Sequence, residues 1–232
     1  MPRELSSPAH HTSRRGQLPF YSEGMDAAQR QLSDQIDDAT QRLLGTVRII
    51  TEPDLREPSL LPGWTRARVA AHLARGADAM RNLLVGARSG QDRPAYASGE
   101  AWDTDVERGA AQDAKDLAAD VADSAMALRT VARQLPDEAW ARSLRVPGLA
   151  PFPAAQLLAR RLVEVELHHC DLAAGYGPAD WPDSFACLEL EEPMATWRQD
   201  RLSWPQELLD SVPPLRPARV PPRPRNVGPL IS

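Results

Sequence analysis

The chain has 232 residues, of which 42% are hydrophobic and 25% are charged, and its net charge is −5. This is the composition of an ordinary globular protein and excludes a wholly disordered chain. The negative charge predicts no general attraction to nucleic acid or anionic membranes, and no apolar stretch approaches the roughly 20 residues that cross a bilayer.

The N-terminal residues 1–24 are polar, contain Pro and Gly, and show no periodicity, so we expect a disordered leader. They lack the apolar segment of a secretory signal. The two cysteines, Cys170 and Cys187, belong to no CxxC pair and offer no disulfide framework. A cytoplasmic location is the simplest expectation for such a chain.

The first predicted helix covers 25–50, where Leu32, Ile36, Leu43 and Val47 follow helical spacing. Residues 51–63 contain three prolines and are predicted to form a loop.

Beyond this loop, Thr65 can cap a second helix over 66–88. A stretch rich in Ser, Gly and Pro over 89–99 separates it from a long Ala-rich helix that we expect over 105–135.

The remaining predicted helices cover 154–174 and 182–202, and a short strand is possible only over 144–146. The fold class that we predict for 25–203 is therefore all-α, an up-and-down bundle of about four long helices. Residues 204–232 are rich in Pro and Arg and are expected to be disordered.

One histidine stands on an apolar helix face. On the helix expected over 66–88, His72 lies between Val69, Gly76 and Leu83 and should point into the bundle. A buried polar group needs a partner, and the simplest interpretation of a single such residue is a hydrogen-bonded core histidine.

A polar stripe follows the helix expected over 154–174. Arg161, Glu164, His168 and Asp171 recur at intervals of three and four, which places Glu164 and His168 on one face. Buried ion pairs within the stripe would explain it without further function.

Two other polar residues of this helix, Glu166 and His169, point elsewhere and are expected at solvated or interface positions.

The two helices together suggest a metal site. His72, Glu164 and His168 would supply two imidazoles and a carboxylate, the ligand set of a catalytic zinc site with one open position. Bundle interiors are known places for metal sites built from facing helices, and Asp171 could orient the imidazole of His168. No catalytic residue beyond these candidates is indicated.

Two sequence segments resemble the mycothiol-dependent maleylpyruvate isomerase family, within the wider group of DinB-like metal-binding helical bundles. The segments are LLPGWTRARVAAHLARGADAM over 60–80 and RRLVEVELHHCDLAAGYGPADWP over 160–182. The first corresponds to the family's LPGW loop and its Ala-His-Leu triplet, and the second to its R-x-x-E-V-E-x-H-x-x-D-L run.

The resemblance implies a divalent metal, usually zinc, bound by His72, Glu164 and His168, with mycothiol as thiol cosubstrate. It also implies addition of the thiolate to the cis double bond of maleylpyruvate, rotation, and elimination to fumarylpyruvate. The predicted partners are thus a small thiol and a small electrophile, and the predicted activity is that of such an isomerase or of a thiol S-transferase.

Active members of the family generally continue into a C-terminal α/β domain, which we do not find after residue 200. Two alternatives therefore stay open. One is a truncated, non-catalytic metal-binding bundle, and the other is a purely structural bundle with buried ion pairs and no metal.

Overall fold

The computed structural model describes residues 25–146, 148–203 and 211–216, so the predicted leader and most of the predicted tail lie outside the described residues. The helices of the described part are α1 Ala27–Val47, α2 Glu52–Leu55, α3 Arg66–Ser89, α4 Gly99–Ala110, α5 Ala114–Arg133, α6 Asp137–Trp140, α7 Gln156–Asp171, α8 Asp183–Ala186 and α9 Met194–Leu202, with the 3-10 turn η1 Pro178–Asp180. Two short strands, β1 Ser143–Leu144 and β2 Phe152–Pro153, pair antiparallel. The fold is mostly helical, as the sequence predicts.

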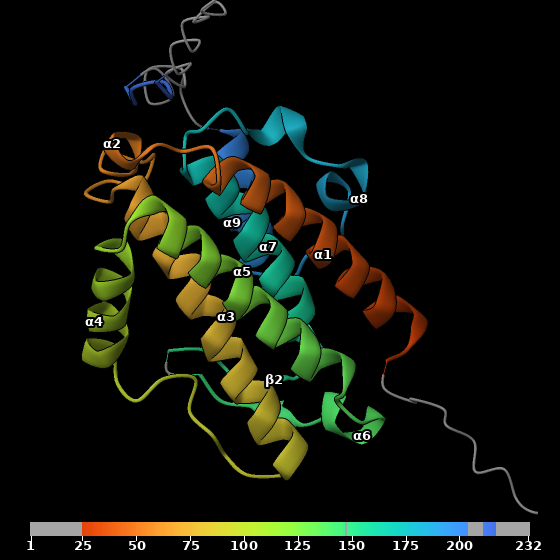
Figure 1. Cartoon of the computed structure of the whole chain (residues 1–232). Helices are drawn as coiled ribbons and strands as arrows, with labels where there is room; N and C mark the ends of the chain where they lie inside the picture. The colour runs from red at the N-terminus through yellow and green to blue at the C-terminus, as the bar shows by residue number, and fades with distance from the viewer. Residues whose placement is uncertain (1–24, 147, 204–210, 217–232) are drawn as a thin grey trace, which may run out of the picture.

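The four longest helices pack into a bundle (Figure 1). Helix α3 contacts α5 and α7, and α1 contacts the same two helices from the other side. Each of the four contributes at least one almost completely buried leucine, namely Leu43, Leu73, Leu117 and Leu162. The apolar face that each helix carries is thereby removed from water, which is the main force that holds such a bundle together.

The long helix expected over 105–135 is wrong, because two helices occupy this part of the chain. Helix α4 ends at Ala110, and α5 begins at Ala114 after a short turn. Asp113 caps α5, since its carboxylate accepts a hydrogen bond of 2.8 Å from the backbone N–H of Asp116. Such a cap satisfies one of the free amides of a new helix and so favours a new start at this position.

The break also changes the direction of the chain, so the expected up-and-down order does not hold for α3 and α5. The first amide of α5, at Ala114, donates to the side chain of Glu52 in α2, which precedes the start of α3. Further along, Arg75 of α3 pairs with Asp120 of α5. Helices α3 and α5 therefore run parallel, with α4 as the return between them (Figure 1).

Two smaller predictions also need correction. The helix expected over 182–202 is divided into α8 and α9. Pro193 stands immediately before α9. Proline has no backbone N–H, so it could not donate the hydrogen bond that a continuous helix requires at this position. The expectation of a strand only over 144–146 is also too narrow, because β2 provides a second strand, in which buried Phe152 pairs with Leu144 of β1.

A fully buried arginine joins three segments of the chain that meet near the start of α3. The guanidinium of Arg66 donates to the backbone carbonyls of Leu172 at 2.9 Å, Ala173 at 3.1 Å and Asp54 at 3.4 Å, and also to that of Pro213. Leu172 is the C-terminal cap of α7, so its carbonyl has no partner within the helix, and Arg66 provides one.

The described segment 211–216 belongs to the Pro- and Arg-rich part of the sequence and lies against the bundle. Val212 is 9% exposed. The Arg216 guanidinium pairs with Glu57 at 2.8 Å, and its backbone N–H lies 3.4 Å from the carboxylate of Asp54. These contacts place the segment beside α2.

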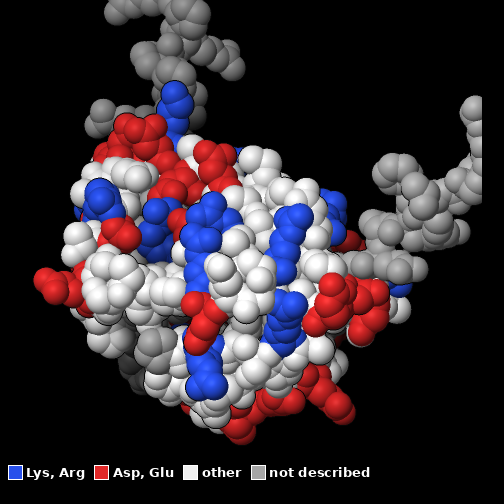
Figure 2. Space-filling model, turned by 90° about the horizontal axis from the view of Figure 1, so that it is seen from below, with Lys and Arg blue, Asp and Glu red and all other residues white. Residues whose placement is uncertain are grey.

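On the face drawn in Figure 2, acidic and basic side chains are interspersed, and neither sign forms a large continuous area. This face therefore has no patch that would attract a polyanion. Within the described residues, every helix is too short or too polar to cross a membrane.

Replacement of Arg66 by Met is expected to lower the free energy of unfolding by about 3 kcal/mol, because several buried carbonyls lose a charged donor. The matched control is Arg68→Met, which removes a partly exposed ion pair with Glu107 and should cost less than about 1 kcal/mol. Urea unfolding followed by circular dichroism measures both. Equal losses in the two variants would contradict the role assigned to Arg66.

Candidate functional site

His72 is placed by α3, whose first turn is capped by Thr65 through a 3.2 Å bond from the backbone N–H of Arg68. Its ring meets two tryptophans edge-on, with centroid distances of 5.3 Å to Trp64 and 5.5 Å to Trp102. These indoles cover the histidine from the loop before α3 and from α4. Aromatic walls of this kind exclude water from a polar group without competing for its hydrogen bonds.

Helix α7 brings a carboxylate to the same place. Arg161, almost completely buried, donates from Nη1 to Oε2 of Glu164 at 2.9 Å and to the backbone carbonyl of Leu73 at 3.0 Å. One guanidinium nitrogen therefore holds Glu164 and at the same time binds α3. The second oxygen of Glu164 is left to face His72.

The other histidine of the set is oriented by an acid below it. Nδ1 of His168 lies 2.7 Å from Oδ2 of Asp171. Asp171 is completely buried, and Arg201 of α9 donates to both of its oxygens at 3.0 Å. In the tautomer that carries its proton on Nδ1 and donates it to this carboxylate, His168 would present the lone pair of Nε2 on the opposite side of the ring.

The structure brings together all three predicted ligand residues. Nε2 of His72 lies 3.7 Å from Oε1 of Glu164, and the rings of His72 and His168 are 4.9 Å apart between centroids. Gly76 makes this approach possible, because a Cβ atom at this position would lie 2.2 Å from Oε1 of Glu164. The carboxylate thus occupies the space that any other residue would fill.

The geometry also bears on the structural alternative, in which buried ion pairs explain the stripe. Both of its pairs, Arg161 with Glu164 and His168 with Asp171, are present. They leave out His72, whose Nδ1 is buried without a hydrogen-bond partner among the described residues. Its Nε2 is too far from Glu164 for a hydrogen bond.

In the part of the chain that the structure describes, no group of three or more His, Cys, Asp and Glu side chains is arranged to hold a metal ion. The donor types nevertheless fit zinc. Around tetrahedral zinc, neighbouring donor atoms lie about 3.3 Å apart, slightly closer than the 3.7 Å between His72 and Glu164. Metal binding by the three residues therefore stays a prediction.

The protonation of His72 suits a ligand. Burial lowers the pKa of its imidazole from 6.5 to about 4, although the nearby Glu164 carboxylate acts in the opposite direction. The ring is therefore neutral at pH 7 and carries a free lone pair, which is the form that binds metals.

A cavity of about 470 Å³ opens beside the three residues. Its walls are mostly apolar, and α3 and α7 form most of them. The loop before α4, α4 itself, the loop before β2, β2 and α9 complete the lining, with Tyr96, Trp102, Phe152 and Trp197 as its aromatic members. Arg160 and Arg201 are its two cationic residues. Such a lining suits a small ligand with an apolar body and one or two polar groups.

Of the two positions expected for Glu166 and His169, solvated or at an interface, the solvated one is wrong, since each is 1% exposed. Helix α1 covers them: Arg42 and the hydroxyl of Tyr176 each donate to Glu166 at 2.6 Å. His169 bonds to Thr46 at 2.7 Å and stacks on the ring of Tyr176. These residues join α7 to α1 and lie on the side of α7 away from His72.

Two residues of the site, Gly76 and Arg201, were not predicted from the sequence to have a functional role. The signal for Gly76 was available, because a glycine in a helix interior costs about 1 kcal/mol relative to alanine and often marks close packing. Arg201 carried no such signal, since it lies 30 residues after Asp171.

Comparisons with known proteins point to one family. A model of the mycothiol maleylpyruvate isomerase N-terminal domain matches residues 36–173, more than half of the chain. The chain belongs to this family. The matched region contains all three candidate ligands and Asp171.

Two solved structures are similar to this family member. The crystal structure of the mycothiol-dependent maleylpyruvate isomerase matches with a TM-score of 0.65 and 27% identity, over 68% of this chain and 65% of that one. A histidine-to-alanine mutant of that enzyme matches with the same TM-score and coverage and 26% identity. The chain thus spans about 65% of the length of these enzymes. No curated protein matches the chain significantly.

The contact at Gly76 predicts the stability of two glycine variants. Gly76→Ala should lower the free energy of unfolding by about 1–3 kcal/mol, because the new methyl group overlaps Glu164. Gly45→Ala in α1 meets no atom within 4 Å and should raise it by about 0.5–1 kcal/mol through helix propensity. Thermal and urea unfolding measure both. Stabilisation by both changes would mean that Glu164 does not lie against α3.

The two cysteines are expected to differ in reactivity. Cys170 is buried, which raises the pKa of its thiol to about 12 and leaves almost no thiolate at pH 8. Cys187 is exposed. A thiol-reactive dye should therefore label one cysteine per chain in the native protein and both in urea. Rapid labelling of Cys170 in the native protein would contradict its buried position.

Proposed function

We propose that residues 25–203 form a metal-binding unit in which His72, Glu164 and His168 bind one divalent ion, in the first instance zinc. We further propose that the adjacent cavity binds mycothiol or a related small thiol together with a small electrophilic substrate. The observation that carries the proposal is the convergence of two imidazoles and a carboxylate, from α3 and α7, on one end of a 470 Å³ cavity.

Zinc bound there would stabilise the thiolate form of a thiol at neutral pH. The protein's own side chains prepare the site. Asp171 holds His168 in the tautomer whose Nε2 is a ligand, and Arg201 holds Asp171. Arg161 fixes Glu164. Outer bonds of this kind commonly change metal affinity by about 10–100-fold when they are removed.

The proposed reaction is that of a maleylpyruvate isomerase. The thiolate electron pair adds to the cis double bond and forms a C–S bond, while the displaced pair moves toward a neighbouring carbonyl group. Rotation about the new single bond follows, and expulsion of the thiolate restores the double bond in the trans form. The thiol is regenerated, and no redox partner is needed. An S-transferase would stop after the C–S bond and take up a proton.

The second candidate function is a metal-binding bundle without catalysis. What favours it is the coverage of the two enzyme structures, of which this chain spans about 65%. In the proposed isomerase the cavity must hold both thiol and substrate, whereas the alternative requires the metal alone.

Adjacent residues of α7 provide a matched test of the metal site. The purified chain should contain about one zinc ion. Glu164→Gln and His168→Gln should each lower zinc affinity at least about tenfold, because loss of a direct ligand should cost at least as much affinity as loss of a residue that only orients a ligand. Glu166→Gln and His169→Gln are the controls, because both residues face α1. Elemental analysis and zinc titration give the readout. Equal loss in all four variants, or no zinc in the parent, would favour the purely structural bundle.

Activity is measured separately on the zinc-loaded full chain. Turnover of maleylpyruvate that requires mycothiol supports the isomerase, and conjugation of mycothiol to an electrophilic acceptor supports the transferase. Stoichiometric zinc with neither activity, and with no binding of mycothiol by calorimetry, supports the non-catalytic bundle instead.

A further inference from the structure

The cavity beside His72 contains a cation to which the proposed reaction assigns no role. Its two cationic residues are Arg160 and Arg201, and Arg201 is committed to the buried carboxylate of Asp171. Arg160 forms no hydrogen bond or ion pair with the residues that the structure describes. A charged side chain left without a partner in a mostly apolar wall is suited to fix the orientation of a ligand.

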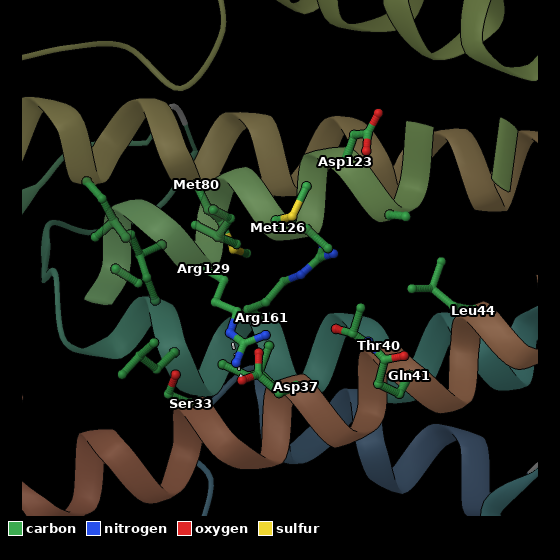
Figure 3. Close-up of a pocket in the computed structure, with 18 of the residues that line it drawn as sticks. Ser33, Asp37, Thr40, Gln41, Leu44, Met80, Asp123, Met126, Arg129 and Arg161 are labelled. Atoms are coloured by element: carbon green, nitrogen blue, oxygen red, sulfur yellow. Dashed lines mark ion pairs between the residues drawn. The ribbon is translucent and has the colours of Figure 1, made fainter. Parts of the chain in front are cut away.

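Helix α7 places Arg160 on the side that faces this cavity. The α7 residues in the cavity wall are related by intervals of three and four, as one helical face requires, and they are Leu157, Arg160, Val163, Glu164, Leu167 and His168. The next residue, Arg161, lines a separate cavity of about 230 Å³ between α1, α3, α5 and α7 (Figure 3). Arg160 therefore shares its wall with two of the candidate metal ligands.

The guanidinium of Arg160 lies on an aromatic ring of the same wall. Its Cζ is 4.2 Å from the ring centroid of Phe152 in β2, which also lines the cavity. Such a contact holds the planar group in place and leaves its N–H groups free for hydrogen bonds. Its Nε is buried without a hydrogen-bond partner among the described residues, but the terminal nitrogens are not. The half-buried side chain thus keeps its terminal N–H groups accessible to a ligand.

The protein supplies no carboxylate in contact with this guanidinium. Burial lowers the pKa of Arg160, and the charge of Glu191 acts in the opposite direction, yet arginine stays protonated at pH 7. Glu191 is exposed and accepts a hydrogen bond of 2.8 Å from Gln156 instead. A ligand carboxylate would supply the missing partner, because its two oxygens match two N–H groups of a guanidinium.

The spacing along α7 suits a small substrate. Arg160 precedes Glu164 by four residues and His168 by eight. At the rise of an α-helix, these intervals correspond to about 6 and 12 Å along the axis. A small electrophile can therefore lie with its reactive double bond near the candidate metal ligands and a carboxylate at Arg160.

We propose that Arg160 selects electrophiles that carry a carboxylate. Its terminal N–H groups bind the carboxylate, and the unsaturated body of the substrate packs among the aromatic residues of the cavity. The inference rests on the proposed function for the reaction that follows binding. The binding step itself requires only the cavity and Arg160, so it can be tested without metal and without turnover.

Cinnamate is the probe, because it is an unsaturated carboxylate with an apolar body, and cinnamamide is the uncharged control of the same shape. Binding is measured by protein NMR titration of the full chain in the presence of a chelator. Cinnamate should bind about tenfold more tightly than cinnamamide, since a charged hydrogen bond is gained. Equal affinities, or no saturable binding of cinnamate, would overturn the proposal.

A pair of variants assigns the recognition to Arg160. Arg160→Met keeps an apolar contact with Phe152 and removes the charge, so it should lower cinnamate affinity about tenfold, to the level of cinnamamide. Arg81→Met is the matched control, because Arg81 belongs to α3, lies outside this cavity and pairs with Asp78 at 3.7 Å. Equal losses in the two variants would show an effect of net charge alone. That result, or unchanged affinity in Arg160→Met, would refute the assignment.

Kinetics on the zinc-loaded chain separate this inference from the proposed function. Arg160→Met should raise KM for maleylpyruvate about tenfold more than KM for uncharged chlorodinitrobenzene, because only the former carries a carboxylate. An active parent whose Arg160→Met variant raises both KM values equally would overturn the inference and leave the proposed function intact. A parent without turnover, but with cinnamate binding that depends on Arg160, would refute the proposed reaction and support the inference.

Discussion

The polar stripe of α7 can lie inside the bundle because its charges are paired there. Arg161 is almost completely buried, and an unpaired guanidinium at such a position would cost several kcal/mol. Its bonds to Glu164 and to the Leu73 carbonyl offset this cost. The same bonds hold α3 and α7 together and aim the carboxylate at His72. The placement of Glu164 beside His72 in the candidate metal site follows from this side chain.

Local periodicity made part of this arrangement predictable. Intervals of three and four residues placed Glu164, His168 and Asp171 on one face of α7, and the apolar neighbours of His72 placed it toward the interior. Both inferences concern a single helix, and helix geometry alone decides them. The pairing of His168 with Asp171 was accessible for the same reason.

Contacts between helices were less accessible. Glu166 and His169 are polar residues of α7. Their burial is compensated by hydrogen bonds to Arg42 and Thr46 of α1, and these contacts form only when the two helices pack together. The turn before Asp113 follows a helix that could have continued on propensity alone, so tertiary packing decided the parallel course of α3 and α5. Arg201 meets Asp171 only because α9 returns to the end of α7, and no pattern in the sequence encodes that return.

The distance between the two halves of the candidate site along the chain has a consequence for protein synthesis. His72 precedes His168 by 96 positions. At about 5–20 residues per second, a ribosome needs roughly 5–20 s to cover that interval. During this time α3 is completed, while Arg161 and Glu164 do not yet exist. The nascent bundle therefore carries a histidine on its apolar face without its partners, and the site can form only after most of the chain has been made.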